Sequence, residues 1–197
     1  MTAPIVLAST SAGRRALLSG AGVAFEPVAP EVDEAAEKRA MGAVDAAALA
    51  ARLAELKALD VSHRRPGAWV VGGDQTLDRD GLLFDKPETI DQARAHLVAL
   101  RGRAHALRAA ICVARDGAVV WRHLSSARLT MRDFSDSFLD AYVAACGRSL
   151  TTSVGAYRLE GPGAQLFESI DGDYFTILGL PLLPLLAFLR GQGALES

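Results

Sequence analysis

The stretch from Trp69 to Pro87 constrains the fold more than any other part of the sequence. It opens with Trp69-Val70-Val71, an apolar run of the kind that forms a buried strand. Gly72-Gly73 follows, and Asp74-Gln75 comes directly after the glycines. Asp80-Gly81 is a strong signal for a two-residue hairpin turn, so the chain is predicted to fold back on itself. In that register the expected pairs are Arg79 with Leu82, Leu77 with Phe84, and Gln75 with Lys86.

The predicted hairpin returns Lys86 to the neighbourhood of Asp74. A carboxylate at the end of a buried strand, next to two glycines and a lysine, is typical of a site for a metal ion, a phosphate group or both. The alternative is a polar strand end with a solvated turn and an incidental ion pair. This stretch by itself leaves both interpretations open, because short motifs carry a false-positive risk.

A second candidate site lies near the start of the chain. Ile5 to Ala8 is predicted to form a short buried strand, Ser9 to Gly13 a loop of small residues, and Arg14 to Ser19 the start of a helix. This order brings backbone N–H groups and the positive end of a helix dipole together, which favours an anion. Arg14 and Arg15 add forked donors for phosphate oxygens. The alternative is a serine-capped helix with two surface arginines.

Two further charged segments are candidates for the same site. The acidic segment Glu31 to Glu34 is either a solvated helix start or a source of carboxylates that hold a divalent cation near the Ser9–Arg15 loop. Ala46 to Leu59 is predicted to be a helix with a leucine face. Lys57 lies near the end of that helix, where a cation is favoured with or without a ligand.

The remaining elements follow from capping, turn and periodicity signals. The glycine-rich segment from Ser153 to Gly163 is either a ligand-binding loop or an irregular connection. His105 and His123 lack a second imidazole or thiol at metal-binding spacing and are predicted to be structural. The other predicted elements are a strand at Val23–Val28 parallel to the first, a helix from Thr89 to Leu100, paired strands at Arg103–Ala114 and Ala118–Thr130, a helix capped by Ser135, a short helix at Ala164–Ile170, a buried strand at Tyr174–Leu178, and a helix from Pro181 to Arg190.

Composition excludes several classes of protein. The chain has 197 residues, which fits one large domain or two small lobes, and half of them are apolar, as in a folded protein. The net charge of -2 gives no overall attraction to nucleic acid or to an anionic membrane. Cys112 and Cys146 have no metal or redox spacing, and we find no signal-peptide pattern or apolar run long enough to span a bilayer. We therefore expect a cytoplasmic protein with no nucleic-acid or membrane partner.

Taken in order, the motifs resemble the Maf family of nucleoside triphosphate pyrophosphatases. The resemblance covers nearly the whole chain, and several ordered motifs are more specific than any single one. It implies a single domain over residues 1–197 with an α/β fold, in which a mixed twisted sheet is flanked by helices and two lobes surround a central cleft. The matching segments are Leu7-Ala8-Ser9-x-Ser11-x-x-Arg14-Arg15-x-Leu17-Leu18, Val32-Asp33-Glu34, Lys57-Ala58, Gly-x-Asp74 with Gly81 and Lys86-Pro87, Gly155-Ala156-Tyr157, Glu160-Gly161, and Gly179-Leu180-Pro181-Leu182.

The resemblance also implies roles for individual residues. Asp74 is expected to act as the base toward water, and Glu34 to join it in holding Mg²⁺ or Mn²⁺. Lys86 completes the expected catalytic set. The expected substrate-binding residues are Ser9, Ser11, Arg14, Arg15 and Lys57 for the triphosphate, and Gln75 and Glu160 for the base. A homodimer is the expected assembly.

Two positions bear on the substrate. Within the family, Asp-Gln after the strand and Glu-Gly later in the chain tend to mark enzymes that act on 7-methyl-GTP, and this chain has Asp74-Gln75 and Glu160-Gly161. Asp-Thr and Gln-Gly tend to mark enzymes that act on dTTP and UTP. We therefore predict a housecleaning pyrophosphatase for 7-methyl-GTP-like nucleotides. The alternatives are a dTTP/UTP pyrophosphatase, or a nucleotide-binding regulator of cell division or septum formation with little turnover.

Overall fold

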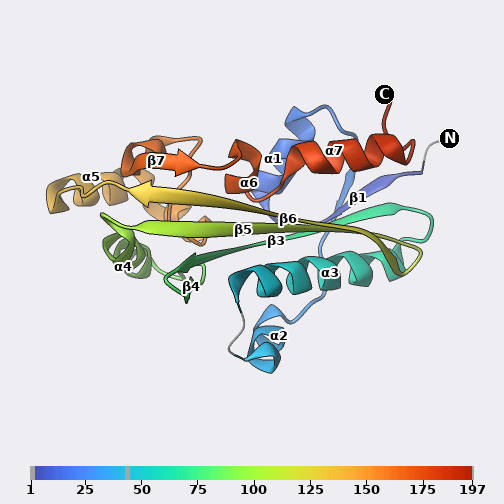
Figure 1. Cartoon of the computed structure of the whole chain (residues 1–197), viewed down its shortest axis with the longest axis horizontal. Helices are drawn as coiled ribbons and strands as arrows, with labels where there is room; N and C mark the ends of the chain where they lie inside the picture. The colour runs from blue at the N-terminus through green and yellow to red at the C-terminus, as the bar shows by residue number, and fades with distance from the viewer. Residues whose placement is uncertain (1–2, 43–44, 197) are drawn as a thin grey trace. The chain divides into compact units, whose positions relative to one another are not determined.

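The computed structural model describes residues 3–42 and 45–196. Among these residues a seven-stranded sheet has the order β2-β1-β3-β5-β6-β7, and β4 pairs with β3 (Figure 1). β1 runs parallel to β2 and to β3, whereas β4 is antiparallel to β3 and β7 is antiparallel to β6. The strands are β1 (Ile5–Ala8), β2 (Glu26–Val28), β3 (Trp69–Arg79), β4 (Leu82–Phe84), β5 (Ala104–Arg115), β6 (Ala118–Met131) and β7 (Phe167–Asp171).

Helices connect and follow these strands. They are α1 (Ala12–Gly20), α2 (Glu34–Met41), α3 (Ala46–Arg64), α4 (Ile90–Leu100), α5 (Asp136–Cys146), α6 (Tyr174–Ile177) and α7 (Leu182–Gly191), with 3₁₀ turns η1 (Gly147–Thr152) and η2 (Pro162–Leu166). The prediction of an α/β fold with a mixed sheet flanked by helices is confirmed. Within the described ranges, no helix combines the length and the apolar character that crossing a membrane requires.

The chain forms two compact units. The first comprises residues 1–75, 108–125 and 174–197, and the second comprises residues 76–107 and 126–173. Most of the predicted site residues belong to the first unit, whereas Lys86 and Glu160 belong to the second.

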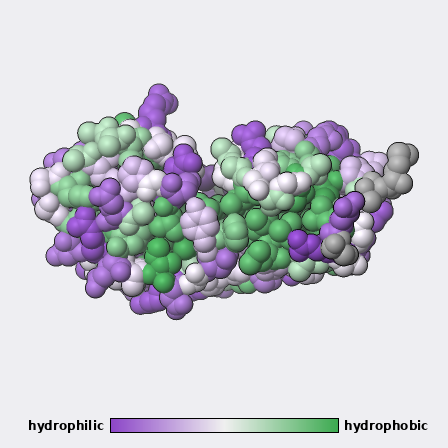
Figure 2. Space-filling model, turned by 90° about the horizontal axis from the view of Figure 1, so that it is seen from above, coloured by the Kyte–Doolittle hydropathy of each residue, from purple (hydrophilic) through white to green (hydrophobic). Residues whose placement is uncertain are grey.

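In the first unit, the alternation of side chains along the strands separates two cores. Odd-numbered strand residues such as Val71 and Ile111 pack with Leu18 of α1 and with the leucines of α7. Even-numbered residues such as Ala110 and Cys112 pack against the alanines of α3. Figure 1 shows α7 and α3 on opposite sides of these strands. Figure 2 looks at the side that carries α7, where apolar surface remains visible among polar side chains, in keeping with the 59% exposure of Leu183.

Close packing of α3 on β3 fixes the position of this helix. A Cβ atom added to Gly72 would lie 2.3 Å from the carbonyl oxygen of Ala54 and 2.6 Å from the amide nitrogen of Ala58. Both contacts are with backbone, which cannot move away as a flexible side chain can. Gly72 therefore lets α3 approach the strand that carries Asp74.

We expect Gly72→Ala to lower the free energy of unfolding by about 3 kcal/mol or more, because overpacking against backbone displaces a whole helix. Chemical denaturation measures this effect. Gly20→Ala is the matched control, since a Cβ at Gly20 meets no other atom within 4 Å. A Gly72→Ala protein as stable as the control would show that α3 has room to shift.

The second unit contains the hairpin of β3 and β4, the start of β5 and the end of β6. The predicted hairpin register is confirmed for Leu77 with Phe84 and for Arg79 with Leu82. β4 ends at Phe84, so the described pairing does not extend to Lys86. α4 and α5 are in contact in this unit, and Leu97, Leu107, Leu129 and Leu139 are fully buried in it.

Two predicted elements near the end of the chain are wrong. Ala164–Ile170 is not a helix: η2 ends at Leu166, and the chain then pairs with β6 as strand β7. Tyr174–Leu178 is not a strand: it contains the helical turn α6, closed by the hydrogen bond from the Leu178 amide to the Tyr174 carbonyl at 3.2 Å. Short apolar runs do not distinguish a strand from a helical turn by periodicity, and tertiary pairing decided both.

Candidate active site

A buried lysine joins two carboxylates at the centre of the candidate site. Lys57 Nζ lies 2.6 Å from Asp74 Oδ1 and 2.8 Å from Glu34 Oε1. The side chains of Lys57 and Asp74 are 7% and 10% exposed, whereas that of Glu34 is 53% exposed. The cluster is therefore reached from solvent on the side of Glu34.

Local structure explains how these side chains meet. On α3, Lys57 stands in the buried stripe formed by Leu53, Ala54, Ala58 and Val61, at the helical spacing of three and four residues. The stripe packs on the strand face to which Asp74 belongs. A buried ammonium needs a partner of opposite charge, and Asp74 in the middle of β3 supplies it.

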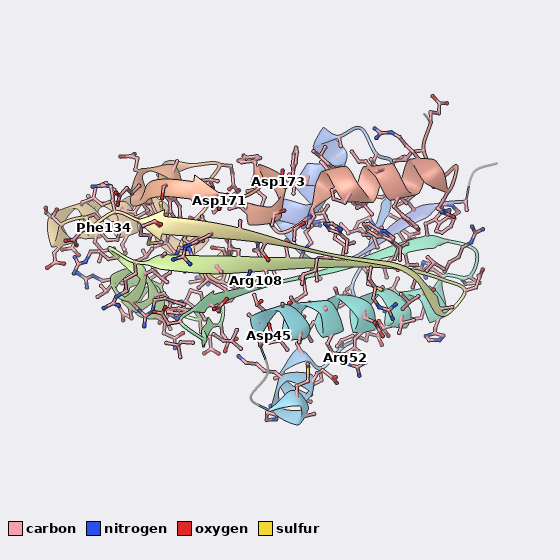
Figure 3. All side chains as sticks on the ribbon, viewed as in Figure 1. Asp45, Arg52, Arg108, Phe134, Asp171 and Asp173 are labelled. Carbon is pink, nitrogen blue, oxygen red and sulfur yellow. The ribbon has the colours of Figure 1, made fainter. Side chains whose placement is uncertain are left out.

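The helix α2 brings Glu34 to the same point. Asp33 caps α2 by accepting a hydrogen bond from the Ala36 amide at 2.8 Å, so Glu34 occupies the first turn. Arg52 of α3, labelled in Figure 3, donates to Glu37 of α2 at 2.6 Å. The acidic segment starts a helix, as the first interpretation predicts, and it also directs a carboxylate toward Lys57, while the binding of a divalent cation stays a prediction.

Burial controls the electrostatics of this cluster. It raises the pKa of Asp74 above its ordinary value, although the neighbouring charges of Lys57 and Arg14 act in the opposite direction. Burial likewise lowers the pKa of the Arg14 guanidinium, against the effect of Asp74 and Glu34. A carboxylate perturbed by both burial and nearby cations is characteristic of functional sites.

The loop after β1 begins beside this part of β3, because Ala8 at the end of β1 pairs with Gly72. Ser11 caps α1 through a hydrogen bond from the Arg14 amide to its Oγ at 3.4 Å. Ser9 Oγ accepts from the Ser11 amide at 3.2 Å and from Arg14 Nη1 at 3.3 Å. Arg14 is buried and Arg15 is exposed. The two arginines therefore differ in their surroundings, which adjacent positions in the sequence did not reveal.

Gln75 contacts a turn whose carbonyl groups the sequence did not place at the site. Its Nε2 donates to the carbonyl of Thr176 at 2.9 Å and to that of Ile177 at 3.1 Å. Arg14 Nε donates to the carbonyl of Gly179, in the same turn, at 2.8 Å. The motif beginning at Gly179 was the available signal for this segment, but a motif does not show which carbonyls face the site.

The other two predicted site residues belong to the second unit. Lys86 is exposed. The Glu160 side chain is 30% exposed and accepts a hydrogen bond from Arg158 Nε at 2.8 Å. Glu160 and Arg158 also line a cavity of about 310 Å³ together with Tyr142 and Cys146. Arg158 is the neighbour of Glu160 that sequence reasoning missed, although it lies only two positions away.

The segment before Glu160 is held by a buried contact. The hydroxyl of Tyr157 lies 2.8 Å from His105 Nε2, and Ser153 Oγ donates to the Tyr157 carbonyl at 2.8 Å. His105 is 2% exposed, and its Nδ1 has no hydrogen-bond partner. Burial lowers the pKa of His105 to about 4. This histidine is therefore structural in its surroundings, as its isolation in the sequence predicted.

A lowered histidine pKa makes stability depend on pH. Above pH 6.5, His105 is neutral in both the folded and the unfolded chain, so it does not make the free energy of unfolding depend on pH. As the pH falls from 6.5 to about 4, only the unfolded chain takes up the proton, so stability is lost over this window. The expected loss is about 3 kcal/mol, since one pKa unit corresponds to about 1.4 kcal/mol.

Denaturation of the wild type and of His105→Gln at pH 7 and at pH 4.5 measures this contribution. We expect the variant to lose less stability than the wild type on acidification, because its amide does not titrate. His123→Gln controls for removal of an imidazole elsewhere and should keep the wild-type difference. Equal losses in the wild type and His105→Gln would contradict the assignment.

Metal ligands are few in this arrangement. The described residues contain no group of three or more His, Cys, Asp and Glu side chains placed to hold a metal ion. Glu34 and Asp74 nevertheless converge on one position, that of Lys57 Nζ. Magnesium commonly takes one or two carboxylates and completes its shell with water and phosphate oxygens. The donor set therefore fits an ion that is shared with a phosphorylated ligand.

The fold and the cluster define an α/β protein in which acidic and basic side chains from α1, α2, α3 and β3 lie together. Residues 4–192 match the family described as Maf-like protein. A nucleoside triphosphate pyrophosphatase of Caulobacter vibrioides is 54% identical over 194 residues, which cover 98% of this chain and 97% of that protein. A protein of the same name from Hyphomonas neptunium is 52% identical over 100% of both chains. A 7-methyl-GTP pyrophosphatase of Rhizobium meliloti is 50% identical over 98% of each chain. The chain belongs to the Maf-like protein family.

Proposed function

We propose that this chain is an enzyme that hydrolyses a nucleoside triphosphate to the monophosphate and pyrophosphate. The observation that carries the proposal is the buried cluster of Lys57 and Asp74 with Glu34, next to Arg14. The names of the full-length relatives support the same activity. Phosphoryl transfer depends mostly on positioning and charge neutralisation, and the cluster supplies groups of both signs. Residues 1–197 act as one functional domain.

In this mechanism water attacks the α-phosphorus and pyrophosphate leaves. Asp74 orients the water and accepts its proton, for which its raised pKa makes it a stronger base than an exposed carboxylate. Without a metal ion, Lys57 pairs with both Asp74 and Glu34. The residues assigned to the triphosphate are Ser9, Ser11, Arg14, Arg15 and Lys86, with Lys57 beside them.

Mg²⁺ or Mn²⁺ is the proposed cofactor, held by Glu34 and Asp74. A bound divalent ion neutralises phosphate charge and lowers the pKa of coordinated water. The exposure of Glu34 supports the assignment, because a phosphate-bound ion would reach it from solvent. Glu34 and Asp74 would both serve as ligands, and Asp74 would also keep its role toward the attacking water.

We assign recognition of the base to Glu160. A carboxylate can accept hydrogen bonds from the N1–H and amino groups of a guanine. Arg158 pairs with Glu160 and would orient it. The relatives named 7-methyl-GTP pyrophosphatase from Rhizobium meliloti and Brucella abortus, at 50% and 48% identity, support a methylated guanine nucleotide. A dTTP or UTP pyrophosphatase is the alternative, and the proposed role is housecleaning of modified nucleotides in the cytoplasm.

Release of pyrophosphate from a panel of nucleotides tests both the activity and the base. The panel contains 7-methyl-GTP, GTP, dTTP, UTP and ATP, each with Mg²⁺, with Mn²⁺ and with a chelator. We expect metal-dependent release that is fastest with 7-methyl-GTP. Tight binding without release on any nucleotide would overturn the proposal and favour a nucleotide-binding regulator of cell division. Light scattering on the same protein tests the expected homodimer.

A further inference from the structure

We propose that Arg52 and Arg64 of α3 are positioning residues for the metal ion. They hold residues 29–37, here called the acidic arm, along α3 and thereby fix where Glu34 lies. The inference rests on the proposed function in that Glu34 is taken as a ligand of the metal ion. Its structural part concerns contacts within the first unit and can be tested without turnover.

The helix α2, with which the acidic arm ends, has no apolar anchor of its own. None of its residues is buried, whereas α3 buries a long apolar stripe. Figure 1 shows α2 next to α3, on the side of α3 that is turned away from the strands. A helix of eight residues is also too short to be stable by itself in water. The position of α2 therefore depends on polar contacts with the side chains of α3.

The first anchor of the arm precedes Glu34 along the chain. Arg64 donates from Nη2 to the Ala29 carbonyl at 3.0 Å and from Nη1 to Glu31 Oε1 at 3.3 Å. Asp60, one helical turn earlier on α3, accepts from the Glu31 amide at 2.9 Å and from Arg64 Nη2 at 2.6 Å. Two backbone groups of the arm are thus held directly by side chains of α3.

The second anchor follows Glu34. Arg52 Nε donates to Glu37 Oε1 at 2.6 Å, and the two side chains are 43% and 24% exposed. Glu37 lies three positions after Glu34, so both carboxylates project from the same face of α2. On α3, Lys57 lies between Arg52 and Arg64, just as Glu34 lies between the two anchors of the arm. The arm therefore runs antiparallel to α3, with Glu34 held from both sides.

Neither anchor uses the carboxylate of Glu34. This carboxylate can exchange the ammonium of Lys57 for a metal ion while the arm stays in place. A ligand that is already positioned lowers the ordering cost of binding. Each exposed ion pair is weak by itself, but the two anchors share no partner and lie about 18 Å apart along α3 at 1.5 Å per residue. Their effects on metal affinity should therefore multiply.

Arg52→Glu tests the inference, because charge and position predict opposite results. The substitution replaces a positive charge by a negative one, so its charge alone would attract a cation more strongly. The new carboxylate also repels Glu37 and should release the end of α2. We expect Mn²⁺ to bind about 5-fold more weakly, with kcat at saturating Mn²⁺ within about 2-fold of wild type. The amides of Glu37 and Gly42, which donate within α2, should exchange at least ~3-fold faster.

Glu37→Arg combined with Arg52→Glu restores the ion pair in the reverse orientation. We expect Mn²⁺ affinity and amide exchange to return to within about 2-fold of wild type. Arg39→Glu is the matched control, because it makes the same change of charge at an exposed position of α2. It should leave Mn²⁺ binding unchanged or make it tighter. Arg64→Gln should weaken Mn²⁺ binding through the first anchor, by a factor that multiplies with that of Arg52→Glu.

Two measurements give the metal affinity. One is isothermal titration with Mn²⁺ alone, and the other is the Mn²⁺ concentration that gives half-maximal release of pyrophosphate. Unchanged or tighter binding to Arg52→Glu by both measurements would overturn the inference, and turnover by the same protein would leave the proposed function intact. Weaker Mn²⁺ binding and faster exchange in α2, in a protein that releases pyrophosphate from no nucleotide, would support the inference and count against the proposed function.

Discussion

Asp74→Asn is expected to lower kcat for nucleotide hydrolysis by ~10² or more, with little change in nucleotide affinity, because an amide cannot accept a proton from water. The Asp74 side chain is nearly enclosed, with 10% of it exposed, so a water molecule from bulk solvent has little access to act as the base in its place. Steady-state kinetics give kcat and nucleotide titration gives the affinity, both at a Mg²⁺ concentration that is shown to saturate the variant. Retained turnover would end the assignment of Asp74 as the base.

Asp80→Asn provides the control for this substitution. Asp80 lies in the hairpin turn after the same strand, with its side chain 82% exposed and a φ of +53° that asparagine also tolerates. We expect wild-type kinetics for this variant. Because Asp74 is buried beside Lys57, the Asp74→Asn protein should also be checked by thermal unfolding, so that lost activity is not confused with lost structure.

Lys57→Met is expected to lower the stability of the metal-free protein and to strengthen its binding of Mn²⁺. Without a divalent ion, removal of the ammonium leaves Asp74 buried without its nearest counter-charge, which should cost about 3 kcal/mol of unfolding free energy. The same removal vacates the position on which Glu34 and Asp74 converge. We therefore expect Mn²⁺ to bind the nucleotide-free variant at least ~10-fold more tightly than the wild type and to recover much of the lost stability.

Isothermal titration with Mn²⁺ alone, and unfolding with and without Mn²⁺, measure these effects without reference to activity. Arg122→Met is the matched control. Arg122 lies on β6 and forms an exposed ion pair with Glu55, which lies on α3 as Lys57 does. We expect this substitution to change stability by only about 0–1 kcal/mol and to leave Mn²⁺ binding unchanged. Weaker Mn²⁺ binding to Lys57→Met than to the wild type would show that Lys57 supports the metal site instead of competing with it.

The two largest predicted effects concern Asp74 and Lys57, which the sequence identified as candidates by residue type and by their place among the motifs. Asp74 follows a buried strand and two glycines, and Lys57 occurs in a leucine-lined helix, so both were candidates before the structure was known. The hairpin register could be predicted because Asp80-Gly81 selects a two-residue turn, which fixes the pairing on either side of it. The matching order of motifs along the chain was enough to indicate the family.

Other features could not be predicted from spacing. The helix at Ala46 extends to Arg64, beyond the expected end at Leu59, because its buried face continues through its own residues Val61 and Ser62. The strand expected at Tyr174–Leu178 is a helical turn closed by backbone hydrogen bonds to the carbonyls of Tyr174 and Thr176, and Gln75 donates to carbonyls of the same turn. A local pattern reports the period of side chains along the chain, but it does not report which distant group satisfies a buried carbonyl.

The sequence by itself determined the local geometry of this protein: a loop and capped helix after the first strand, a hairpin with one register, and a helix whose buried stripe contains a lysine. Backbone periodicity and turn chemistry act over a few residues, so these features can be predicted from a short stretch of sequence. Only the tertiary structure decided that Lys57 links Glu34 to Asp74, and that Gln75 faces away from them toward α6. Buried charges and amides must find partners wherever the packed strands and helices bring them, and that choice depends on residues far apart in the chain.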